Sequence, residues 1–245
     1  MPSLQHAVNR ALDAVRDPEL DEAITELGFV AGIDVHEGAV RVRLRLPTYF
    51  CAPNFAWLMV ADARQAVAAV PGVTAVDVWL EDHFASDQIN GGVARESGFQ
   101  GAFPGLANDE LSELRHAFRR KAFQARQHRL VAALRRAGMS RAALCALRLG
   151  DLDAGPETAV YLQRRAELGL PVDDDAPVVL TVDGHVVPPQ DLDEHLARIR
   201  TVDVSIEGNA GFCRGLLATR YPDGRQRATP PGSPAEPIGG PSRPR

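Results

Sequence analysis

The stretch that decides the fold is Leu46-Pro47-Thr48-Tyr49-Phe50-Cys51-Ala52-Pro53-Asn54, a loop between an alternating strand pattern and a helix start. Pro53 suits the first helical position, because the N–H group that proline lacks has no partner within a helix at that point. Cys51 is therefore expected just before a helix N-terminus, a setting that favours the thiolate, which binds metals and attacks electrophiles. The alternative is that Cys51 is a small buried residue with no chemical role.

Two strands precede this loop, and a helix and a third strand follow it. Ile33 and Val35 alternate with polar residues, and after the Glu37-Gly38 turn the apolar residues of 40–46 alternate with three arginines. We expect a helix over 55–70 and a strand over 73–80. A strand, a helix and a further strand of one sheet normally place the two strands in parallel. The second and third strands should therefore end at the same edge of the sheet.

Side chains that can bind metals collect at this edge. Cys51 follows the second strand, Glu81, Asp82 and His83 follow the third, and the first strand begins nearby at Gly28. A thiol, two carboxylates and an imidazole are ligands suited to iron or zinc. The sequence therefore predicts a transient metal site at Cys51, Glu81, Asp82 and His83. Alternatively, the last three residues are a polar strand end without a ligand.

Two helices are expected before the first strand, over residues 4–15 and 18–27. Asp17 can cap the second of them, Pro18 can take its first position, and Glu19 adds a carboxylate to its first turn, with Gly28 ending it. This structural role explains the Asp-Pro-Glu motif better than a catalytic carboxylate pair does. The predicted fold class is α+β, an α-α-β-β-α-β domain with a three-stranded mixed sheet.

The order of these motifs resembles the small metal–sulfur (iron–sulfur) cluster assembly domain of PaaD-like and SufT-like proteins and of the eukaryotic cytosolic iron–sulfur targeting factor. The resemblance covers about residues 4–84. It implies a non-enzymatic role in maturing iron–sulfur proteins, with Cys51 as a transient ligand of iron or of a cluster. The positions that match the family motif are Asp17, Pro18, Glu19, Gly28, Thr48, Cys51 and Pro53, although Pro47 and Ala52 depart from the family pattern.

A cluster normally takes about four thiolates, so one loop cysteine has to share it with a client metalloprotein, a second protomer or other ligands. The loop is also aromatic, and Tyr49, Phe50 and Trp57 are candidate partner-binding residues. A second reading therefore has this loop dock on a metalloenzyme such as an oxygenase without carrying any metal.

We expect domain boundaries at 1–84, a linker over 85–107, a mainly helical client-recognition domain over 108–220 and a disordered tail over 221–245. The linker assignment follows from its glycines and its lack of periodicity. Arginines crowd a helix that begins near residue 108, which makes nucleic-acid regulation a third and weaker reading. Residues 138–199 faintly resemble a degenerate tyrosine-recombinase catalytic domain, and 137–153 resemble its core helix. Ser140 and Ala143 stand where that family has a catalytic arginine and glutamate, so recombinase activity is not expected.

The three cysteines are widely spaced and include no CxxC pair, which argues against a disulfide framework. Cys145 is expected in a helix core. Cys213 lies in a glycine-rich stretch, 208–215, which predicts a loop with an activating cation, Arg214, and makes Cys213 a second reactive, cofactor-binding thiol.

The chain of 245 residues has a formal net charge of −5 and 45% hydrophobic residues, enough to bury a core. No apolar run reaches the roughly 20 residues of a membrane span, and the amino terminus lacks a signal-peptide pattern. We expect a cytoplasmic protein that does not bind membranes and makes little general contact with nucleic acid.

Overall fold

A mixed three-stranded sheet organises the N-terminal part of the chain, in a computed structural model that describes residues 3–105 and 111–222. Strand β1 (Val30–His36) pairs antiparallel with β2 (Ala39–Leu44), and β2 pairs parallel with β3 (Ala75–Leu80). Helix α2 (Pro53–Ala68) forms the crossover between the parallel strands. The predicted α+β class and mixed sheet are confirmed, and β2 and β3 end at one edge of the sheet.

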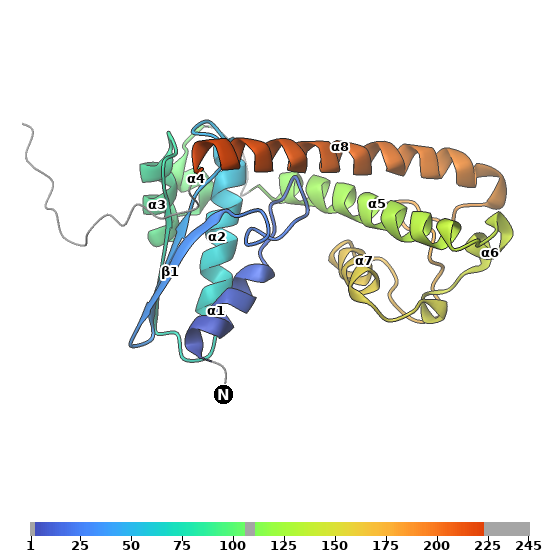
Figure 1. The fold of residues 1–245 in the computed structure, drawn as a ribbon, viewed down its shortest axis with the longest axis horizontal. Helices are drawn as coiled ribbons and strands as arrows, with labels where there is room; N and C mark the ends of the chain where they lie inside the picture. Colours follow the sequence, from blue (N-terminus) through green and yellow to red (C-terminus); the bar gives the residue numbers. More distant parts are fainter. Residues whose placement is uncertain (1–2, 106–110, 223–245) are drawn as a thin grey trace, which may run out of the picture.

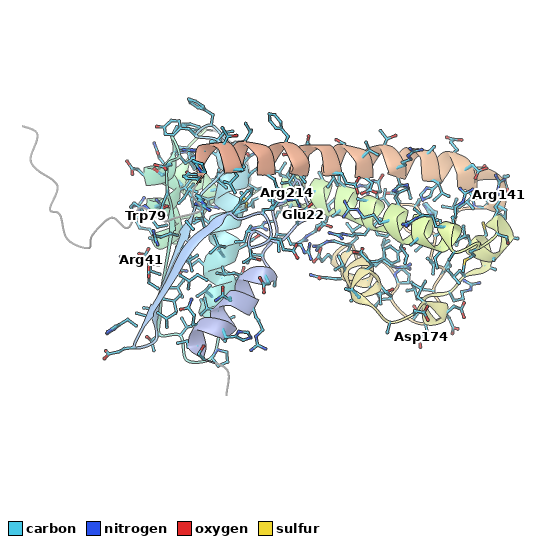
Figure 2. All side chains as sticks on the ribbon, in the orientation of Figure 1. Glu22, Arg41, Trp79, Arg141, Asp174 and Arg214 are labelled. Atoms are coloured by element: carbon cyan, nitrogen blue, oxygen red, sulfur yellow. The ribbon has the colours of Figure 1, made fainter. Side chains whose placement is uncertain are left out.

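Helices cover one face of this sheet (Figure 1). Val40, Val42 and Leu44 of β2 are buried with α2 and with α1 (Leu4–Asp13), because alternate residues of a strand point to the same face. The opposite face carries Arg41 and Trp79, both labelled in Figure 2, and Trp79 is 47% exposed. The alternating arginines therefore lie on the solvated face that the sequence predicts.

The predicted helix over 18–27 does not form. The Asp17 carboxylate accepts the N–H groups of Glu19 and Leu20, as at a helix start, but Asp21 adopts a left-handed φ of 52°. That conformation ends a helix. The chain then returns toward the end of α1, where the Ile24 N–H donates to the Val15 carbonyl, and the segment is a series of turns.

The expected linker instead contains two helices, α3 (Ser86–Ala94) and α4 (Gly98–Ala102). Ile89 of α3, Phe99 of α4 and Phe103, which follows α4, are buried in the core of the N-terminal part, which we call the first core. A Cβ atom on Gly92 would lie 2.6 Å from the Trp57 ring, so this glycine permits close packing rather than flexibility. The linker assignment was wrong for 86–102, whereas the domain boundaries themselves stay a prediction.

The rest of the described chain is mainly helical, as predicted. Its helices are α5 (Ser112–Arg136), α6 (Arg141–Ala146), α7 (Pro156–Glu167) and α8 (Leu192–Arg220), with short 3₁₀ turns at Leu149–Asp151 and Pro189–Asp191. This part has its own core, which includes Phe123, Val131, Leu144 and Tyr161. The recombinase resemblance predicts a core helix over 137–153, but α6 has only six residues, because Leu147 turns into an extended conformation.

Helix α8 runs beside α5 and returns to the N-terminal sheet, while α7 lies on the other side of α5 (Figure 1). The 29 residues of α8 correspond to a helix length of roughly 44 Å at 1.5 Å per residue. The predicted glycine-rich loop over 208–215 is therefore wrong, since these residues lie inside α8, where Ala210 is fully buried. The tail predicted to be disordered falls, beyond Pro222, outside the described residues. No helix within the two described ranges is both long and apolar enough to cross a membrane.

Candidate functional site

The Cys51 loop lies at the edge of the sheet where β2 and β3 end. Cys51 is half-buried directly before α2, whose first residue is Pro53, as predicted. Its Sγ atom lies 3.3 Å from the Thr48 hydroxyl, and that hydroxyl also accepts the Phe50 N–H at 3.2 Å. Thr48 therefore fixes the shape of the loop and orients the thiol.

His83 supports this loop from the end of β3. Its Nε2 atom lies 2.7 Å from the Cys51 carbonyl oxygen, and its Nδ1 atom accepts the Ala85 N–H at 3.2 Å. Because a carbonyl only accepts, Nε2 carries the proton. Burial lowers the pKa of His83, and the Arg220 charge lowers it further against the hydrogen bond to Cys51. Both ring nitrogens are engaged, so His83 braces the loop instead of offering the free metal-binding nitrogen that the sequence predicts.

The two neighbouring carboxylates also have protein partners. Glu81 pairs with Arg43 at 3.4 Å, and Asp82 accepts the Tyr221 hydroxyl at 3.2 Å. Residues 3–105 and 111–222 contain no group of three or more His, Cys, Asp or Glu side chains arranged to hold a metal ion. The four predicted ligands thus share one edge of the sheet without forming a ready-made site.

The Asp-Pro-Glu motif is a buried turn beside the site. Asp17 is 7% exposed, and its carboxylate accepts the Glu19 and Leu20 N–H groups at 2.9 Å. Burial raises the pKa of Asp17 to about 6, against these two hydrogen bonds. The motif therefore stabilises a turn, and not the helix start that the sequence predicts.

The last turns of α8 contact the Asp-Pro-Glu turn and the Cys51 loop, a feature that the sequence analysis missed. Asn209 donates to Glu19 at 3.3 Å, and Arg214 forms an ion pair with Glu22 (Figure 2). Arg220 donates to the Leu46 carbonyl at 3.1 Å and to the Asp82 carbonyl at 2.5 Å. The sequence signal that could have revealed it is the helical spacing of apolar residues that are buried in α8, including Ile206, Ala210 and Leu217.

Cys213 lies on this part of α8, half-buried, and packs against the same hydrophobic core as Cys51. Burial raises the pKa of Cys213 to about 11, and the charges of Asp17, Cys51 and Glu19 act in the same direction. The prediction that Arg214 activates the Cys213 thiol was wrong, because Arg214 forms an ion pair with Glu22 and the pKa of Cys213 is raised. Cys145 packs against the second core, away from this site.

Three exposed aromatic side chains stand beside the Cys51 loop, and we call Tyr49, Phe50 and Phe84 the aromatic rim. They are 46%, 77% and 46% exposed, and the ring centroids of Tyr49 and Phe50 lie 5.0 Å apart. Phe84 contacts both of the other rings. The sequence prediction named the first two members and missed Phe84. Trp57 is 7% exposed and packs on Phe99, so its predicted partner-binding role was wrong.

Several arginines of α5 form ion pairs within the chain. Arg126 pairs with Asp21 and Arg129 with Asp203. Further pairs join Arg115 to Asp62, Arg120 to Asp183 and Arg135 to Asp193. These pairs reduce the positive charge that α5 offers to a phosphate backbone.

Known proteins match the N-terminal part of the chain. A family model described as "Iron-sulfur cluster assembly protein" matches residues 5–78. Proteins named "Iron-sulfur cluster carrier protein" from Mycobacterium leprae and Mycobacterium tuberculosis are each 40% identical over 79 residues, 32% of this chain and 20% of the relative. This chain therefore matches only about a fifth of their length.

A relative of similar size to the matched part comes from Methanocaldococcus jannaschii. This protein, named only as uncharacterized, is 32% identical over 84 residues, which make up 34% of this chain and 86% of the relative. The matched residues contain the Asp-Pro-Glu turn, the sheet and the Cys51 loop. Through these residues, the chain belongs to the iron–sulfur cluster assembly protein family.

Proposed function

We propose that this chain is a non-enzymatic assembly factor that holds iron or an iron–sulfur cluster transiently at Cys51 and passes it to a client metalloprotein. The observation that carries this proposal is the placement of Cys51. Its thiol lies half-buried before a helix N-terminus, in a loop fixed by Thr48 and His83, within the residues that match the family.

Transient binding follows from the small number of protein ligands. The family-matched residues contain one cysteine, whereas a cluster normally takes about four thiolates. The remaining ligands would come from the client, a second protomer or small thiols. A cargo held in this way is easily transferred, because a client that supplies more thiolates binds it more tightly.

The helical part is the proposed client-recognition unit. Helices α5 to α8 lie outside the family match and form a separate hydrophobic core, while α8 extends back to the Cys51 loop. A client bound along these helices would be held close to the thiol. The client and a cytoplasmic location are parts of this proposal.

Anaerobic reconstitution with ferrous iron and sulfide tests the metal-carrying role. Wild type and Cys145→Ala are expected to gain iron and the visible absorption of a thiolate-bound cluster, and Cys51→Ala is expected to lose most of both. Cys145→Ala is the matched control, because Cys145 is also half-buried but packs in the second core. Equal iron content in the Cys51→Ala and control variants would refute the proposal.

A second candidate, a docking protein that carries no metal, is favoured by the aromatic rim. Exposed aromatic residues in mutual contact suit a protein-binding surface. We would measure maturation of a co-purifying metalloprotein with Phe50→Ser and Cys51→Ala. Phe212→Ser is the control, since Phe212 is 67% exposed on α8. Maturation that survives Cys51→Ala but is lost with Phe50→Ser would favour docking over metal carriage.

A further inference from the structure

One face of α8 lies on the Asp-Pro-Glu turn and on Gly28, at the start of the first strand. Asn209 contacts Glu19 at 3.3 Å, and the Leu217 side chain lies 3.2 Å from the position that a Cβ atom on Gly28 would occupy. Cys213 lies four residues from each of them, and residues four apart share one face of a helix. Cys213 is therefore on the face of α8 that is directed toward this turn and Gly28.

Packing and charge both relate Cys213 to Cys51. Both thiols are half-buried and pack against the same hydrophobic core, whereas Cys145 packs against the other core. The charges that act on Cys213 include those of Asp17 and Cys51. Arg220, seven residues further along α8, donates to the Leu46 carbonyl at the start of the Cys51 loop. The position of α8 before Cys213 is thus fixed to the Asp-Pro-Glu turn, and the position after it is fixed to the Cys51 loop.

We propose that Cys213 and Cys51 form a two-thiol site for a thiophilic metal ion, in which α8 supplies a ligand that the family domain lacks. This inference rests on the proposed function and deepens it. Residue 213 lies outside the family match, which ends at residue 78. The chain would then hold its cargo through two of its own thiolates and need fewer ligands from other molecules.

The surroundings of the two thiols suit a cation rather than an anion. Asp17, 7% exposed, and Glu19 lie on this side of α8, and the nearby Arg214 is neutralised by Glu22. A metal cation that displaces the two thiol protons would therefore meet compensating negative charge. Two thiolates are also soft ligands, which select iron, zinc or cobalt over magnesium or calcium.

Phenylarsine oxide tests the pairing of the thiols independently of any function. This reagent condenses with two neighbouring thiols, forming two As–S bonds and releasing one water, with no change in oxidation state. Reduced full-length wild type and Cys145→Ser should each lose two free thiols for every arsenical bound. Cys51→Ser and Cys213→Ser should bind it at least ten-fold more weakly. Unchanged binding by Cys213→Ser would overturn the proposal, and circular dichroism would show that each variant is folded.

Anaerobic titration with cobalt(II) alone separates this inference from the proposed function. The thiolate-to-cobalt absorption is expected to fall to about half in Cys213→Ser and in Cys51→Ser, and to stay unchanged in Cys145→Ser. Loss in Cys51→Ser alone would overturn the two-thiol site and leave the proposed function standing. Equal absorption in all four proteins would overturn both.

Discussion

Asp21 connects the family domain to the helical part through a buried charge cluster. The carboxylate is 5% exposed and accepts Arg126 Nε at 2.6 Å, Arg164 Nε at 2.8 Å and Arg164 Nη2 at 2.7 Å. Its backbone carbonyl accepts Arg126 Nη2 and Arg16 Nη1, both at 2.7 Å. Arg126 belongs to α5 and Arg164 to α7, so one residue of the N-terminal turn is joined to two helices of the helical part.

Asp21→Asn isolates the charge. Asparagine tolerates the left-handed φ of 52° and keeps the side-chain volume. However, its NH₂ group would face a guanidinium, and no hydrogen bond forms between these two groups because both are donors. The two arginine side chains are 8% and 7% exposed and would lose their shared counter-ion. Removing one partner of a buried pair typically costs about 3–5 kcal/mol. Glu167 still pairs with Arg164, so we expect about 3 kcal/mol.

Urea unfolding followed by far-UV circular dichroism measures this loss. Asp183→Asn is the matched control, because Asp183 also pairs with an arginine of α5 at 2.8 Å, but with 59% of its side chain exposed. Exposed pairs contribute at most about 1 kcal/mol and weaken in high salt. A free-energy loss for Asp21→Asn within about 1 kcal/mol of the control would refute the buried-cluster argument.

Two further predictions concern other buried groups. Because burial raises the pKa of Asp17 to about 6 from 3.8, its stabilising contribution is fully present below the unfolded value and is lost as pH rises through about 6. The free energy of unfolding of Asp17→Asn minus that of wild type should thus rise by up to about 3 kcal/mol between acid and neutral pH. A difference that does not change with pH would contradict this. The lowered pKa of His83 makes stability change with pH in the opposite direction, but both proteins contain His83, so its contribution cancels in the difference. Trp57→Ala should cost about 3–5 kcal/mol in urea unfolding, whereas Phe50→Ala, on the exposed rim, should stay within about 0.5 kcal/mol.

Local patterns predicted the sheet and its edge well. Alternation in β1 and β2, the turn at Gly38 and proline at the start of α2 are signals that neighbouring residues alone determine. The parallel pairing of β2 and β3 then followed from connectivity, and with it the positions of Cys51 and His83 at one edge. What the pattern could not reveal was the orientation of the imidazole, which depends on backbone atoms of residues 51 and 85.

The wrong predictions share a physical cause, which is distant contacts. Residues 17–20 carry helix-start signals, but Asp21 is fixed by Arg126 and Arg164. These two arginines follow it in the sequence by 105 and 143 residues. Gly92 and the glycines within 208–215 led to the predictions of a linker and of a loop. Gly92 instead admits the Trp57 ring, and α8 continues through its glycines because Ala210 and Leu217 are buried. Tertiary packing overrides local propensity at these positions.

The way α8 is held bears on the exchange of cargo that we propose for Cys51. In the middle of the helix, Asp203 is 3% exposed and accepts hydrogen bonds from His128 and Arg129 of α5, each at 2.7 Å. Beyond Ala210 the helix is held by exposed hydrogen bonds, such as those of Arg214 and Tyr221, and by one well-buried side chain, Leu217, which is 7% exposed. Exposed pairs contribute little individually, whereas breaking a buried pair is costly. Separating the last turns from the Cys51 loop is therefore expected to cost less than opening the joint with α5, and the burial of Leu217 is its main cost.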